Sequence, residues 1–94
     1  MDKIEEAREF LKLVGMPKAQ QTDLCCYVVL AMAGIKPEMQ WKDAKNEWIR
    51  IHDIIRFSNT VYGTTYAENS RETFRKQALH RFRTAALIDN MKEI

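Results

Sequence analysis

Apolar residues recur at helical spacing in four segments of this chain. The first segment covers residues 3–14, and its apolar positions, three or four residues apart, predict one buried face. Asp2 is placed to cap the free N–H groups at its start, and Glu5 stands where a capping-box acid belongs. Gly15 and Pro17 stop the helix. The apolar positions are Ile4, Ala7, Leu11 and Val14.

The second segment starts between Ala19 and Thr22 and ends before Gly34. Its run from 24 to 33 is apolar on every side, which is typical of a helix surrounded by other elements. Aromatic and β-branched residues in that run leave a buried strand as the alternative. The length of the run and the closing glycine favour a helix.

An irregular segment, 34–46, follows, and we expect Trp41 to anchor it on the core. The third helix is predicted over 47–62, where Gly63 allows the positive φ that closes such a helix. Residues 64–68 then form a turn. The inward side of this third helix is predicted to consist of Trp48, Ile51, Ile54, Ile55 and Val61.

The fourth helix starts at Asn69 or Ser70, with Glu72 again in a capping-box position. Its buried stripe is predicted to be Phe74, Ala78 and Phe82, with Leu79 at the edge. The apolar tail 85–88 either extends this helix or begins a strand. The fold class is therefore all-α: a small bundle of about four main helices, in which the last two form a helix-turn-helix.

Size and composition agree with one small soluble domain. The 94 residues allow a real but limited core, and 46% hydrophobic with 30% charged residues is ordinary for a globular protein. The longest apolar run is about half of a bilayer span, and the acidic N-terminus does not resemble a secretory signal. We therefore expect a cytoplasmic protein without a membrane partner.

The two cysteines are adjacent in the sequence. Cys25 and Cys26 are interpreted as small buried hydrophobes in a reducing compartment.

Charge is distributed unevenly along the chain. The net charge is only +2, which alone would not suggest nucleic acid. Between Arg71 and Arg83, however, five cationic residues stand against a single acid, Glu72. A modest total can therefore conceal a basic face on the fourth helix.

That face is the candidate functional site, because it carries the side chains that read a major groove. Arginine and lysine suit guanine, glutamine suits adenine, and threonine can meet the thymine methyl. Residues at the start of the helix are better placed for a phosphate. A solvated cationic surface without a ligand is the alternative interpretation. The candidate DNA-binding residues are Asn69, Ser70, Arg71, Thr73, Arg75, Lys76, Gln77, His80 and Arg83.

Catalytic and metal-binding patterns are missing from the sequence. His52 and His80 have no metal spacing with cysteine or each other, and the three glycines form no phosphate loop. Pro37-Glu38 with 43–45 loosely echoes the acidic-x-lysine pattern of metal-dependent nucleases, but within one short loop between helices. We predict no catalytic residue and no metal ligand, and we interpret Tyr66 and Trp48 as packing residues.

Two groups of residues are shared with a known protein family. The opening group is Glu6-Ala7-Arg8 with Leu11, followed by 15–21. The more specific group lies in the second half, where the stretches are 62–63, 66–77, 79–82 and 86–87. On these residues the chain resembles, over roughly residues 6–89, the N-terminal helix-turn-helix domain of type II restriction endonucleases of the BsuBI/PstI family. In that family an Asn-[Ser/Thr]-Arg-Glu-Thr stretch opens the second helix of the motif.

The resemblance implies a double-stranded DNA-binding module of a Mg²⁺-dependent endonuclease that cuts the palindrome CTGCAG. It implies a nuclease domain C-terminal to this one, so the chain is expected to be a non-catalytic fragment without a cofactor of its own. The full-length enzyme is expected to be a homodimer. A wing-like segment expected after Asp89 would be truncated, leaving the stub of a winged helix. A helix-turn-helix transcriptional regulator and a helical protein-interaction module remain as alternatives.

Overall fold

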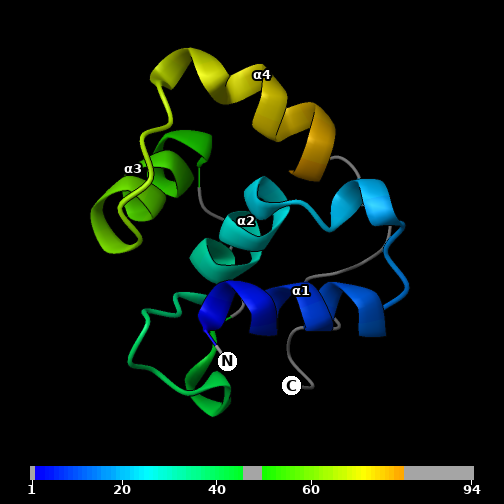
Figure 1. Cartoon of the computed structure of the whole chain (residues 1–94). Coiled ribbons are helices and arrows are strands. Elements are labelled where there is room, and N and C mark those ends of the chain that lie inside the picture. Colours follow the sequence, from blue (N-terminus) through cyan, green and yellow to red (C-terminus); the bar gives the residue numbers. More distant parts are fainter. Residues whose placement is uncertain (1, 46–49, 80–94) are drawn as a thin grey trace.

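The computed structural model describes residues 2–45 and 50–79, and within them the chain is all-helical, without a strand. Helix α2 lies in the middle, with α1 along one side and α3 and α4 on the other (Figure 1). The helices are α1 (Lys3–Leu13), α2 (Asp23–Ala33), α3 (Ile51–Val61) and α4 (Arg71–Phe74). Short 3₁₀ turns are η1 (Lys18–Gln20), η2 (Trp41–Asp43) and η3 (Glu68–Ser70), and α4 continues into the π-helical turn η4 (Arg75–Leu79). The predicted all-α class is confirmed.

Helix α2 supplies most of the core. All but two of its eleven residues are buried, so a helix that is apolar on every side has indeed become the central one. The side chain of Thr22 caps its start by accepting from the Cys25 N–H, and Gly34, at φ +67°, ends it. The strand alternative is excluded for this segment.

Helix α1 covers one flank of α2 with the predicted face. Ala7 and Leu11 are buried, and the Asp2 side chain accepts from the Glu5 N–H at 3.0 Å, as the capping pattern predicts. Phe10 is also buried, although the predicted stripe did not include it. Leu13 points outward and is 85% exposed.

The segment between α2 and α3 is attached to the core at two points. The Trp41 indole Nε1 donates to Glu6 Oε1 at 2.8 Å, and its ring stacks on Phe10 with centroids 6.4 Å apart, so the predicted anchor is confirmed. The Tyr62 hydroxyl, at the end of α3, donates to the Ile35 carbonyl at 2.6 Å. Burial raises the pKa of Tyr62 to about 12.

The predicted start of the third helix was wrong. Arg50 has extended backbone angles, φ −72° and ψ 153°, and α3 begins at Ile51 without a side-chain cap. The predicted helix started too early because Trp48 and Ile51 are separated by a helical interval. Such an interval indicates which side chains would share a face of a helix, but it does not show where helical backbone angles begin. Trp48 itself lies outside the described residues.

The second capping box was also wrong. Asn69 sits inside the 3₁₀ turn η3, and Ser70 precedes α4 without a side-chain hydrogen bond to it. Glu72 pairs instead with Arg75, three residues further along the helix. The helix then widens at Arg75–Leu79, where a π turn was not expected.

Candidate nucleic-acid interface

The turn between α3 and α4 is held by one amide side chain, that of Asn59. Its Oδ1 accepts from the Tyr66 N–H at 3.0 Å and from the Thr64 hydroxyl at 2.6 Å. Its Nδ2 donates to the Tyr66 carbonyl at 2.9 Å, while Gly63 reverses the chain at φ +72°. The Asn59 side chain therefore provides the hydrogen-bond partners that the backbone N–H and carbonyl of Tyr66 would have from neighbouring backbone in a regular helix or strand. The sequence reading missed it, although an asparagine one turn before a glycine is a typical turn signal.

Aromatic packing fixes which side of α4 faces inward. Tyr66 meets Phe74 edge-on with ring centroids 5.0 Å apart, and Tyr27 of α2 meets Tyr66 at 6.2 Å. Phe74 and Ala78 are fully buried. Tyr66 is thus a packing residue, as predicted, and two of the predicted stripe residues are confirmed. Phe82 and the Leu79 side chain lie outside the description.

Two further contacts join segments of α2, α3, η3 and η4 that are distant in sequence. His52 Nδ1, in the first turn of α3, lies 2.8 Å from Glu68 Oε1 in η3. Cys25 Sγ of α2 donates to the Gln77 carbonyl of η4 at 3.4 Å. Helices α3 and α4 are therefore held in one relative orientation by contacts at several points.

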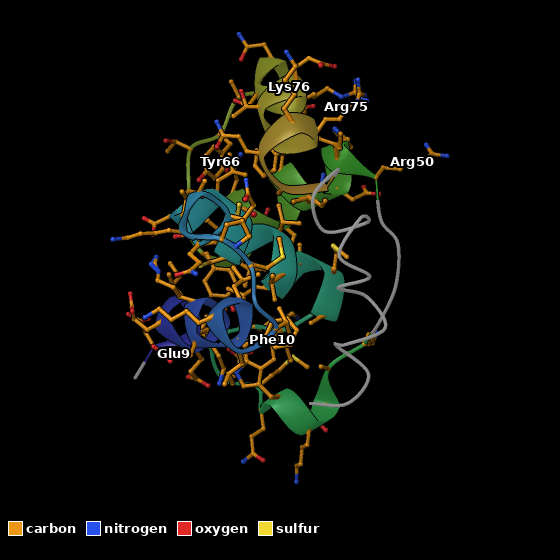
Figure 2. The ribbon with its side chains drawn as sticks, turned by 90° about the vertical axis from the view of Figure 1, so that its right-hand side faces the viewer. Glu9, Phe10, Arg50, Tyr66, Arg75 and Lys76 are labelled. Carbon is orange, nitrogen blue, oxygen red and sulfur yellow. The ribbon has the colours of Figure 1, made fainter. Side chains whose placement is uncertain are left out.

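The candidate residues lie mostly at the surface. Opposite the buried pair of Phe74 and Ala78, Lys76 stands at the centre of the outward face. Figure 2 shows Arg75 and Lys76 at the end of the molecule remote from Glu9 and Phe10 of α1. Ser70 is half-buried. The exposed candidates are Asn69, Arg71, Thr73, Arg75, Lys76 and Gln77. His80 and Arg83 lie outside the described residues.

The charge of this face is positive. Arg71 and Lys76 have no ion-pair partner within residues 2–45 and 50–79, whereas Arg75 pairs with Glu72. An exposed pair of this kind contributes at most about 1 kcal/mol, so a phosphate can replace the carboxylate at small cost. Three cations against one acid therefore make the surface attractive to a polyanion.

A metal site and a reactive thiol would each place requirements on the described residues. No group of three or more histidine, cysteine or acidic side chains within them could hold a metal ion. Cys25 and Cys26 are buried free thiols, and burial raises the pKa of Cys26 to about 11, so it stays protonated at neutral pH. In the same part of the chain, no helix has the length and apolar character needed to traverse a bilayer.

The sequence matches one protein family along almost its whole length. The family model described as the BsuBI/PstI restriction endonuclease HTH domain matches residues 1–93. The chain is 36% identical over 84 residues to the type II restriction enzyme BsuBI of Bacillus subtilis, covering 89% of this chain and 27% of that protein. It is 31% identical over 70 residues to the type II restriction enzyme AplI of Arthrospira platensis, covering 74% and 22%.

A solved structure has the same fold. The chain superposes on the SdaI restriction endonuclease with a TM-score of 0.79 and 32% identity, over 84% of this chain and 25% of that one. The chain therefore spans about a quarter of the length of the relatives that it matches.

Proposed function

Because this chain belongs to the BsuBI/PstI restriction endonuclease HTH domain family, we propose that it is the double-stranded DNA-binding module of a type II restriction endonuclease. In this proposal the outward face of α4 and η4 enters the major groove. The observation that carries it is the exposure of Lys76, opposite the buried Phe74 and Ala78, and of Gln77 on the adjoining flank of the helix. A recognition helix must expose its polar side chains, and these two are exposed in the described part of the chain.

The proposed contacts divide into two kinds. Thr73, Lys76 and Gln77 are placed to meet base edges, because they share the outward side of the helix. Asn69, Ser70 and Arg71, at the start of α4, meet phosphates. Arg75 exchanges its bond with Glu72 for a phosphate. On sequence alone, His80 is added to the base-reading group and Arg83 to the phosphate-binding group.

The finer parts of the proposal concern the whole enzyme. We assign CTGCAG as the target, Mg²⁺-dependent cleavage to a domain outside this chain, and a cytoplasmic location. A palindromic target has two equivalent halves, so a homodimer of the parent enzyme would place one helix-turn-helix on each half-site. The present chain alone should bind DNA without cutting it.

The test is binding of labelled duplexes, measured by fluorescence anisotropy over a range of salt concentrations. We expect weak binding that falls steeply with salt, by about 0.9 in the log–log slope for each phosphate neutralised. Replacing both Lys76→Ala and Gln77→Ala should weaken binding and remove any preference for a CTGCAG duplex over a scrambled one.

The matched control is Lys42→Ala in η2, which removes an exposed cation on the α1 side of the molecule. This variant should bind DNA like the unchanged chain. An affinity that does not respond to salt, or a double variant that binds as well as the control, would contradict the proposal. Either result would favour a protein-interaction module.

A further inference from the structure

Helix α3 and the start of α4 are held together by side-chain contacts, so that residues on one element have a defined position relative to the other. Asn59 holds Tyr66, His52 holds Glu68, and the buried Ile54 and Phe74 pack in the same core. A side chain on the outer face of α3 therefore keeps a constant place relative to α4. If α4 enters a groove, this outer face is brought to the duplex with it.

Arg56 lies on the α3 face that borders the chain leading into α4. His52, Arg56 and Asn59 follow one another at intervals of four and three residues, so they share one side of the helix. The residues before and after Arg56 on this side both contact the segment from Tyr66 to Glu68. Arg56 is exposed between them.

Two acidic residues of this region, Asp53 and Glu68, form no ion pair with Arg56 within the described residues. Glu68 lies 2.8 Å from His52 instead, and Asp53 precedes Arg56 by three residues on the same helix. Neither Arg56 nor Arg50, the residue before α3, forms an ion pair with any residue of the described ranges. Figure 2 shows Arg50 reaching outward on the side of the molecule to which Arg75 also extends.

We infer that Arg56 and Arg50 bind backbone phosphates of the duplex, as a second set of contacts beside the α4 face. The inference rests on the proposed function, because it needs α4 in the groove. A helix in the major groove has a phosphate strand on each side, and the helix before it in the motif crosses that backbone. A guanidinium offers paired donors that match phosphate oxygens. These contacts position the domain and carry no sequence information.

The test compares Arg56→Gln and Arg50→Gln with Lys42→Gln, so that each variant loses one exposed cation. Loss of one phosphate contact should lower the log–log salt slope by about 0.9, which makes the variant bind about eightfold more weakly than the unchanged chain at 0.1 M salt if the two bind equally at 1 M. The loss should be equal for CTGCAG and scrambled duplexes. Arg56→Lys, which keeps the charge, should keep the slope and shows that the effect is not one of folding.

The outcomes separate this inference from the proposed function. If both arginine variants show the slope of Lys42→Gln while the Lys76/Gln77 double variant is weakened, α3 does not touch the backbone and the proposed function stands. If the unchanged chain binds without salt dependence, both fail together. If Arg56→Gln alters the preference between the two duplexes, the contact is to a base and the assignment to phosphate is wrong.

Discussion

Helices α2 and α4 are built in opposite ways. Helix α2 buries all but two of its eleven residues, whereas the stretch from Arg71 to Ala78 buries only Phe74 and Ala78. The first is held by burial on every side, and the second by a small number of separate contacts. The comparison teaches that the described part of the helix proposed to meet DNA joins the core through two side chains only, so its outward residues can vary without loss of the fold.

The separate contacts of α4 can be named. Phe74 packs on Tyr66, the Gln77 carbonyl accepts from Cys25, and Asn59 holds the turn that precedes the helix. Each of these groups sets where the outward face points. Substituting such a group should therefore affect both stability and DNA binding, whereas a core residue of α2 should affect stability alone.

The largest expected effect comes from Phe74→Ala. This fully buried ring is the main apolar anchor of α4, and truncating a buried phenylalanine costs about 3–5 kcal/mol. Urea unfolding followed by circular dichroism measures the loss. We also expect the remaining folded protein to bind DNA more weakly, because α4 loses its fixed orientation.

Leu30→Ala in α2 provides the comparison for that result. Leu30 is fully buried, and its truncation should cost about 2–5 kcal/mol. The folded fraction should keep its full affinity for DNA, since Leu30 belongs to α2 and not to the contacts of α4. Equal losses of affinity in the two variants, once corrected for the folded fraction, would remove the distinction between the helices.

A smaller loss is expected from Asn59→Ala. The substitution leaves the backbone N–H and carbonyl of Tyr66 without their side-chain partner, and an unsatisfied group costs about 1–3 kcal/mol. Binding of DNA should weaken too, because the turn sets the angle between α3 and α4. Unfolding curves and anisotropy titrations on the same samples provide both measurements.

Asn59→Asp is the matched variant for this turn. It keeps an acceptor for the Tyr66 N–H and the Thr64 hydroxyl but loses the donor to the Tyr66 carbonyl. Its stability should lie between those of the unchanged protein and Asn59→Ala. An alanine variant that is as stable as the original would show that water replaces the side chain.

Much of the fold was predictable because apolar spacing reports which side chains face inward. The burial of Leu11 in α1 and of Phe74 and Ala78 in the last helix followed from that spacing. The exposure of Lys76 and Gln77 follows from the same pattern, since neither residue belongs to the buried stripe of this helix.

Contacts between segments that are far apart in the sequence were not predictable. Asn59 reads as a polar residue on an amphipathic helix, and its role exists only once Gly63 has turned the chain back. Likewise, the bond from Cys25 to the Gln77 carbonyl joins residues that are 52 apart in sequence. The π turn at that carbonyl has no periodic signal, because it changes the periodicity itself.

The smallest expected effect is a pH-dependent change in stability at Tyr62. This residue attaches α3 to the segment between α2 and α3, and not to α4. Tyr62 donates to the Ile35 carbonyl, and burial raises its pKa from 10.0 to about 12. Because the pKa is higher in the folded state, the stabilisation is complete below about pH 10 and is lost as the pH rises toward 12. Tyr62→Phe removes the ionisable hydroxyl, so the stability difference between the two proteins should shrink over this interval.

The partly exposed side chain of Tyr62 keeps this change in stability small. Urea midpoints of both proteins at several alkaline pH values measure it, and parallel curves would show that Tyr62 ionises equally in the folded and unfolded states. DNA affinity at neutral pH should be the same in both, since Tyr62 attaches α3 to the loop and not to α4.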